Sequence, residues 1–238
     1  MKKTLAAAFS RTIPVLMGYL FLGVAFGILM TQNGFSPWWA LVMSLLVYAG
    51  SMQFVLITLM AGGANLIEVA LTTLMVNFRH IFYGLSFLDK YNDVGWRKPY
   101  LIFSLTDETY SLLCGAEQAP EGIDRGNYYL SVSALNHFYW TAGSVLGAVF
   151  GALISFDSTG IDFSMTALFT VTCVEQWISS PEHRPALVGL GAAVGSLLIF
   201  GADNMVIPAM LAIVAVLLTL RAPLEKAEEK RAGKEQQG

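Results

Sequence analysis

Long apolar runs, separated by short polar or Gly/Pro-containing segments, make up most of this chain. The runs are continuous, without the alternation of a half-buried strand, and most approach the roughly 20 residues that cross a bilayer as a helix. They lie at about residues 13–31, 38–62, 66–88, 99–115, 128–155, 161–178, 186–201 and 205–221. Because only helices and closed barrels satisfy their backbone in hydrocarbon, the pattern predicts an all-α, polytopic transmembrane helical bundle with seven or eight helical segments.

Composition excludes an ordinary soluble domain. Hydrophobic residues make up 55% of the 238 residues and charged residues only 13%, about half of the share usual in soluble proteins. From Thr12 to Phe78 the single ionisable carboxylate is Glu68, and no basic side chain occurs. The formal charge is -3 and no basic patch is interleaved with aromatic residues, so the expected partner of this surface is the lipid bilayer and not nucleic acid.

Basic residues at both ends predict the orientation of the chain. Lys2, Lys3 and Arg11 precede the first run, and a second group of lysines and arginines follows the last run. Lysine and arginine in short loops favour the cytoplasmic side, so both termini are expected to be cytoplasmic. We therefore expect one transmembrane transporter domain, residues 1–223, and a charged cytoplasmic tail, residues 224–238.

Two places in the pattern are candidates for broken helices. Eight complete crossings would put the basic loop at residues 90–98 outside, which favours segments that are interrupted or re-entrant. Residues 48–53 place a glycine and three hydrogen-bonding side chains within a long apolar run, and residues 200–204 carry a glycine before Asp203 and Asn204. Glycine is also common in ordinary transmembrane helices, and the second place also fits a tight turn, so these alternatives stay open.

A faint internal repeat connects the two halves of the chain. Residues 23–29 read GVAFGIL and residues 147–153 read GAVFGAL, and Gln53 and Gln176 occupy corresponding places in the runs that follow. Duplicated halves are common in transporters, which bind their substrate at the repeat interface. Small residues four positions apart also recur wherever membrane helices pack closely, so both explanations remain open.

Polar clusters interrupt the apolar runs at residues 77–80, 106–109 and 175–176. An ionisable group at the bilayer centre costs roughly 2.5–3.5 kcal/mol on insertion scales, so each cluster needs a partner or a purpose. Arg79 stays charged and is expected to pair with Asp107 or Glu108. Adjacent helical residues point about 100° apart, so the carboxylate that does not pair is expected to face a cavity.

Glu175 is the predicted proton carrier, because apolar surroundings favour the protonated form of a carboxylic acid. The alternatives are that Glu175 lies at the end of its span, and that Arg79 and His80 lie at a cytoplasmic helix end. One histidine beside two carboxylates does not define a metal site, so we expect a structural His80, no metal and no cofactor. No nucleotide-binding or hydrolase motif occurs, which argues against an enzyme. The five tryptophans, Trp140 among them, are expected to anchor span ends at the membrane interface.

Three segments together carry a resemblance to a known family: SLLVYAGSMQF at residues 44–54, LTTLMVNFRHIFYG at residues 71–84 and TDE at residues 106–108. In these segments the chain resembles the AzlC-type large subunit of bacterial branched-chain amino acid exporters. The resemblance implies a multi-pass protein of the bacterial cytoplasmic (inner) membrane that exports leucine, isoleucine and valine, with methionine as a further candidate. It also implies a heteromeric complex with a small AzlD-type membrane subunit, and coupling to the proton gradient.

An amino-acid substrate needs a receptor for its carboxylate and another for its ammonium group. A helix N-terminus near Gly50 would favour the carboxylate, and Asp107 or Glu108 would hold the ammonium. The predicted substrate-binding residues are Gly50, Ser51, Gln53, Asn77, Asp107 and Glu108. Two other functions remain open: a channel or passive pore for a small polar solute, and a non-transporting membrane scaffold.

Overall fold

In the computed structural model, regular structure in the described part of the chain is entirely helical, which confirms the all-α prediction. The structure describes residues 2–114, 119–120, 122–153, 160, 163–179, 182–201, 205, 208–209 and 211–220. The chain groups into two compact units, Met1–Phe169 and Thr170–Gly238. The predicted cytoplasmic tail lies outside the described residues.

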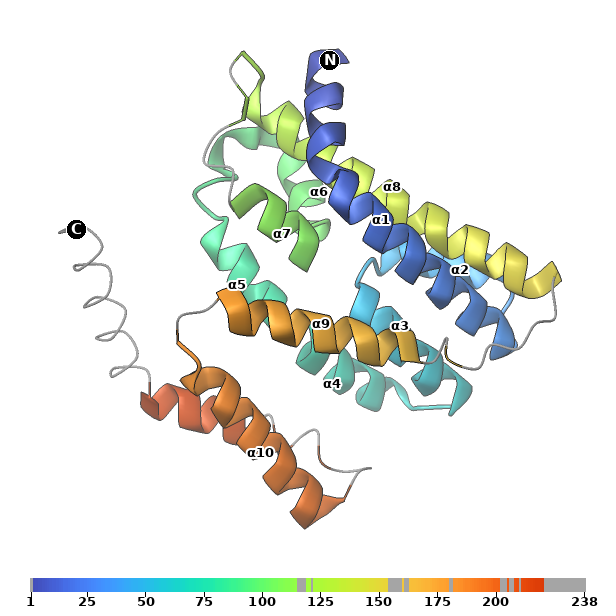
Figure 1. Cartoon of the computed structure of the whole chain (residues 1–238), viewed down its shortest axis with the longest axis vertical. Helices are drawn as coiled ribbons and strands as arrows, with labels where there is room; N and C mark the ends of the chain where they lie inside the picture. Colours follow the sequence, from blue (N-terminus) through green and yellow to red (C-terminus); the bar gives the residue numbers. More distant parts are fainter. Residues whose placement is uncertain are drawn as a thin grey trace. The chain divides into compact units, whose positions relative to one another are not determined.

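The helices that lie wholly within the first unit run from α1 to α8 (Figure 1). Their bounds are α1 Lys2–Gln32, α2 Pro37–Leu46, α3 Gly50–Ala61, α4 Leu66–Asn77, α5 Arg79–Ser86, the 3-10 helix η1 Asn92–Arg97, α6 Lys98–Phe103, α7 Asp107–Cys114 and α8 Arg125–Leu153. Further along the chain come α9 Phe163–Ser179, α10 Arg184–Phe200 and a helix at Leu211–Leu220. Beyond α9 the imidazole of His183 stacks on Trp177, with ring centroids 4.1 Å apart.

Several predicted segments are broken into shorter helices. The break expected at residues 48–53 is confirmed: α2 ends at Leu46, Tyr48 has a φ of 41°, and α3 begins at Gly50. Two breaks were not predicted, one at Phe78 between α4 and α5 and one at residues 104–106 between α6 and α7. These breaks place helix ends in the interior of runs that read as continuous.

The other candidate break, at residues 200–204, is described only in part. Helix α10 ends at Phe200, and Gly201 follows with a φ of 75°, a left-handed conformation that glycine adopts without strain. Residues 202–204 lie outside the described part, so the choice between a discontinuous helix and a tight turn stays open.

The two longest helices of the first unit, α1 and α8, run side by side (Figure 1). Glycines permit their close approach: a Cβ atom on Gly27 would collide with the backbone of Ser144, and one on Gly147 with the backbone of Val24. The two copies of the repeated motif therefore face each other across this seam, which is the small-residue packing common between membrane helices. Duplication of the halves stays a prediction.

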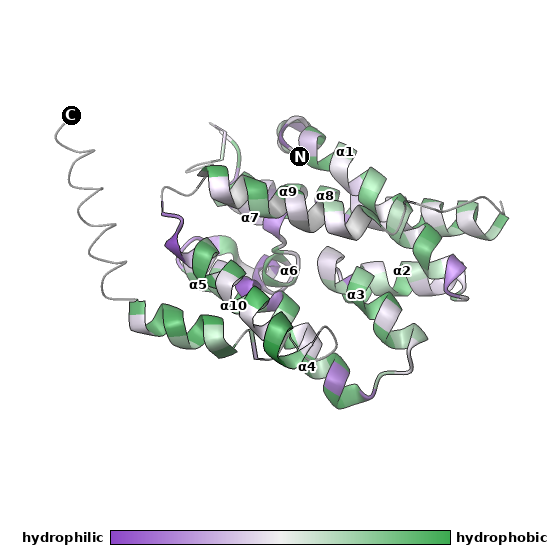
Figure 2. Cartoon of the chain, turned by 60° about the horizontal axis from the view of Figure 1, so that its bottom comes forward, coloured by the Kyte–Doolittle hydropathy of each residue, from purple (hydrophilic) through white to green (hydrophobic). Residues whose placement is uncertain are grey.

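Hydrophobic side chains cover the outer surface of the helices as well as their interior. Met17 and Phe21 of α1 are 69% and 70% exposed, and Leu66 of α4 is 87% exposed. Figure 2 shows the hydrophobic residues along α3 and α4. Among the described residues, α1 alone is long and apolar enough to cross a membrane by itself, whereas α2, α3, α4, α10 and the helix at Leu211–Leu220 are shorter apolar helices. The number of crossings therefore stays a prediction.

Trp140 corrects one expectation. It lies in the middle of α8 with 2% of its surface exposed, where its ring packs edge-on against Tyr19 at a centroid distance of 5.3 Å. It also stacks on Phe26 at 6.2 Å, so it belongs to the core between α1, α3 and α8 and not to the membrane interface. Trp38 and Trp96, by contrast, are 67% and 78% exposed.

Candidate functional site

The N-terminus of α3 lies inside the first unit and has free backbone donors. The first hydrogen bond of the helix runs from the N–H of Gln53 to the carbonyl of Ala49 at 2.8 Å, so the N–H groups of Gly50, Ser51 and Met52 have no partner within the helix. Ala49 occupies the cap position and has no side chain that can accept from them. Such a helix end carries a partial positive charge and favours an anion.

Gln53 connects three helices through its amide. The indole N–H of Trp140 donates to Gln53 Oε1 at 2.8 Å, and Gln53 Nε2 donates to the hydroxyl of Ser44 at 3.3 Å. Gln53 is fully buried, and Gly50 contacts the same indole, because a Cβ atom there would lie 3.2 Å from the ring of Trp140. The amide of Gln53 therefore fixes where α3 begins relative to α2 and α8.

An ion pair lies directly at the start of α3. The Nη2 atom of Arg79 is 2.7 Å from Oδ2 of Asp107 and donates to the hydroxyl of Ser51 at 2.9 Å. Arg79 is the first residue of α5, Asp107 the first of α7 and Ser51 the second of α3, so three of the helix breaks meet here. The charged side chains are 28% and 26% exposed, so the pair is largely but not wholly withdrawn from the surface.

Both members of the ion pair keep unused hydrogen-bonding atoms. Within the described part of the chain, Arg79 Nε, Asp107 Oδ1 and Asn77 Oδ1 are buried and have no hydrogen-bond partner. An unsatisfied buried polar group costs about 1–3 kcal/mol. One donor and two acceptors therefore remain on the ion pair and on Asn77, two positions before Arg79, and a small zwitterion can satisfy such a set.

Glu108 points away from this pair, so only one of the two adjacent carboxylates contacts Arg79. The hydroxyl of Tyr19 donates to Glu108 Oε2 at 2.6 Å and lies 2.8 Å from the hydroxyl of Thr106. The divergence follows from the rotation between adjacent residues of α7. Glu108 therefore contacts Tyr19 of α1, and its expected position at a cavity stays a prediction.

Two polar residues of α8 belong to the same interior and were not selected from the sequence. Asn136 donates to the hydroxyl of Thr109 at 3.0 Å. His137 has Nε2 3.1 Å from the carbonyl of Ser44, at the end of α2, and Nδ1 3.1 Å from the hydroxyl of Tyr100. Both are polar residues that interrupt an apolar run. Arg79 was selected from the sequence by the same criterion, which would therefore have selected these two residues as well.

Two further sequence predictions concern His80, which follows Arg79 in the chain, and Glu175. The His80 Nδ1 atom is 3.2 Å from the carbonyl of Asn77, one turn earlier in the chain. In the side chains that the structure describes, no three histidine, cysteine or acidic groups come together as metal ligands. Glu175 lies in α9, but its side chain and that of Gln176 are outside the described part, so the proton-carrier role stays a prediction.

Helices with outward-facing hydrophobic side chains and a charged cluster at interior helix breaks define the class of a helical membrane protein. A family model described as "AzlC protein" matches residues 14–154, which include Ser51, Arg79 and Asp107. The chain belongs to the AzlC family, as its resemblance predicted.

Relatives extend the match beyond this region. The "Branched-chain amino acid transport protein AzlC" of Bacillus subtilis (strain 168) is 48% identical over 222 residues, which cover 93% of this chain and 87% of that protein. An "Uncharacterized membrane protein" of Helicobacter pylori is 41% identical over 223 residues, 94% of this chain and 97% of that protein. The "Inner membrane protein YgaZ" of Escherichia coli (strain K12) is 25% identical over 193 residues, 78% and 77% of the two chains. No solved structure matches the chain.

Proposed function

We propose that this chain is the large subunit of a secondary transporter that exports branched-chain amino acids across the cytoplasmic membrane. The observation that carries the proposal is the contact of the α3 N-terminus with the pair of Arg79 and Asp107, each of which has a polar atom without a partner among the described residues. The name of the Bacillus subtilis relative supports the substrate class. In this proposal the protein is multi-pass with both termini cytoplasmic, works with a small AzlD-type membrane subunit and uses the proton gradient.

The carboxylate of the substrate binds at the N-terminus of α3. The N–H groups of Gly50 and Ser51 and the Nε of Arg79 supply donors on the side that already favours negative charge. When the substrate carboxylate binds Arg79, it takes the place of the Asp107 carboxylate at the same guanidinium. Substrate entry therefore loosens the contact between Arg79 and Asp107 instead of leaving either charge unpaired.

The ammonium group of the substrate binds at Asp107 and Asn77. Asp107 Oδ1, on the ion pair itself, and Asn77 Oδ1, two positions before Arg79, are buried acceptors without a partner among the described residues, whereas Glu108 already accepts from Tyr19. The geometry therefore favours Asp107 over Glu108 as the ammonium receptor, and it gives Gln53 a positioning role at the start of α3. A hydrophobic pocket separates aliphatic substrates by only about 10–200-fold per methylene, so selectivity among leucine, isoleucine and valine is expected to be broad.

Leucine counterflow in proteoliposomes tests the proposed function. Vesicles loaded with unlabelled leucine and containing this chain together with the small subunit are expected to accumulate labelled leucine transiently. Vesicles with this chain alone show whether the partner is required, and vesicles loaded with aspartate control for specificity. Flux without acceleration by internal leucine would indicate a passive pore, and no flux in either preparation would leave only the scaffold function.

Proton coupling gives a separate prediction for Glu175. Glu175→Gln is expected to abolish leucine movement driven by an imposed pH gradient while leaving leucine counterflow intact, because glutamine has nearly the shape of glutamate but cannot take up and release a proton at neutral pH. Glu68→Gln is the matched control, since Glu68 is an exposed carboxylate at the first turn of α4. An unchanged response to the pH gradient in Glu175→Gln would remove Glu175 from the proton pathway.

A further inference from the structure

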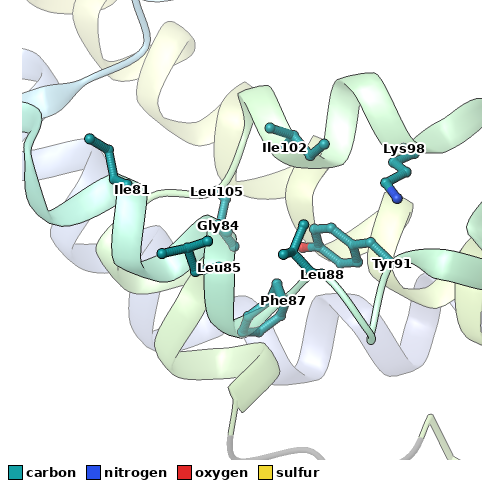
Figure 3. Close-up of a pocket in the computed structure, with 9 residues that line it drawn as sticks. All are labelled: Ile81, Gly84, Leu85, Phe87, Leu88, Tyr91, Lys98, Ile102 and Leu105. Atoms are coloured by element: carbon teal, nitrogen blue, oxygen red, sulfur yellow. The ribbon is translucent and has the colours of Figure 1, made fainter.

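An apolar pocket of about 210 Å³ lies between α5 and α6 (Figure 3), and neither member of the ion pair lines it. Its wall consists mainly of aliphatic and aromatic side chains. The two residues with polar groups, Tyr91 and Lys98, lie close together at the right of Figure 3. The lining residues are Ile81, Gly84, Leu85, Phe87, Leu88, Tyr91, Lys98, Ile102 and Leu105. Ile81, Leu85, Leu88 and Ile102 are each about half exposed, so the pocket opens along the outer surface of these helices.

Tyr91 supplies a buried donor that nothing in the described part of the protein satisfies. The residue is 1% exposed, and its ring is fixed by edge-on contacts with Phe87 at 5.2 Å and Tyr129 at 5.9 Å. Its hydroxyl has no hydrogen-bond partner among the described residues. In Figure 3 the hydroxyl oxygen points from the ring toward Leu88, another residue that lines the pocket. A ligand with an acceptor at this position would satisfy a group that otherwise costs about 1–3 kcal/mol.

Lys98 supplies a cation at the same end. Its Nζ atom has one long contact, 3.5 Å to Asn92 Oδ1, and within the described residues no carboxylate lies within 4.0 Å of it. The neighbouring cations are engaged elsewhere: Lys90 donates to the carbonyls of Leu113 and Cys114, and Arg97 donates to Asn127. Lys98 is therefore the basic group of this segment that is available to an anion.

We propose that this pocket binds an anionic phospholipid. One acyl chain lies along the aliphatic wall, the Tyr91 hydroxyl donates to an ester carbonyl of the glycerol, and Lys98 pairs with the phosphate. The charge of Lys98 and the Tyr91 hydroxyl favour a phospholipid over two other candidate ligands, a helix of another subunit and the amino acid leucine. A helix of another subunit is about 10–12 Å wide and has its carbonyls already satisfied. Leucine would leave its ammonium unpaired, because the lining residues that the structure describes include no carboxylate.

Gly84 allows the pocket to be filled without disturbing the protein. A Cβ atom on Gly84 meets nothing within 4 Å, although the residue lines the pocket. Leucine also has a higher helix propensity than glycine, so Gly84→Leu is compatible with α5. Gly18→Leu is the matched control: Gly18 lies within α1, and its Cβ likewise meets nothing within 4 Å.

Native mass spectrometry of the full chain, with phosphatidylglycerol and phosphatidylcholine offered in equal amounts, tests the proposal. The wild type and Gly18→Leu are expected to retain phosphatidylglycerol preferentially, and Gly84→Leu is expected to lose the bound lipid. Lys98→Gln is expected to lower the preference for phosphatidylglycerol about fivefold, the size of one cation's attraction to an anionic surface. Tyr91→Phe, which removes only the hydroxyl, is expected to weaken retention of both lipids equally.

Three outcomes would overturn the proposal. Gly84→Leu could retain as much phosphatidylglycerol as Gly18→Leu, or Lys98→Gln could keep the full preference while Lys3→Gln, an exposed lysine of α1, loses it. Oleate could also displace phosphatidylglycerol completely at equal concentration, which would assign the pocket to a free fatty acid. Thermal unfolding of each variant, measured in parallel, distinguishes loss of lipid from loss of fold.

Discussion

Gly147→Leu is expected to abolish the folded protein, because α1 and α8 can no longer approach each other. A Cβ atom at Gly147 would overlap the backbone of Val24, and one at Gly27 would overlap that of Ser144. Backbone atoms cannot rotate away as a side chain can, so the helices must separate along the whole seam. Overpacking costs about 1–3 kcal/mol where side chains can adjust, and a larger loss is expected here. A loss of this size is a substantial part of the roughly 5–15 kcal/mol free energy of unfolding of a typical domain.

Yield of monodisperse protein on size-exclusion chromatography and the midpoint of thermal unfolding measure the effect. Gly147→Ala is expected to lower the midpoint and Gly147→Leu to give aggregated protein. Gly18→Leu provides the control, because it adds the same side chain to α1 where no atom lies within 4 Å. Equal yields for Gly147→Leu and Gly18→Leu would show that the seam between α1 and α8 does not hold the fold together.

The sequence predicted the helical class and one break because both depend on local chemistry. Polar side chains around Gly50 interrupt a long apolar run, and Tyr48, two residues before Gly50, has the positive φ that marks the break. The breaks at Phe78 and at residues 104–106 carry no glycine or proline, so the runs read as continuous. Tertiary contacts at Arg79 and Asp107 stabilise these breaks, and contacts between distant segments are not visible in hydrophobic periodicity.

The candidate site shows the same division between local and distant information. An arginine within a run that is expected to lie in the membrane requires a partner, and the sequence narrowed the choice for Arg79 to two adjacent carboxylates. Whether Asp107 or Glu108 pairs with Arg79 depends on how α7 is rotated relative to α1 and α5. A single sequence does not specify this rotation. The burial of Trp140 depends equally on its acceptor, Gln53, 87 positions away in the chain. Long-range pairing therefore decides the details that local patterns leave open.

Arg79→Ala is expected to reduce leucine counterflow about 10- to 100-fold. Removing the guanidinium deletes the ion pair to Asp107 and the hydrogen bond to Ser51, and hydrogen bonds to charged groups contribute about 1.5–3 kcal/mol each. Asp107→Ala is expected to have an effect of similar size, because it leaves Arg79 charged in a half-buried site. Neither loss by itself distinguishes a structural pair from a substrate site.

The double variant Arg79→Asp with Asp107→Arg makes that distinction. If the two side chains act only as a structural pair, exchanging their charges restores both thermal stability and counterflow toward wild-type values. If they bind the substrate, the exchange restores stability but not counterflow, because an aspartate at position 79 lies beside Ser51 and the α3 N-terminus and repels the substrate carboxylate. We expect the second result. Recovered counterflow in the double variant would contradict the proposed substrate site while leaving the ion pair as a structural contact between α5 and α7.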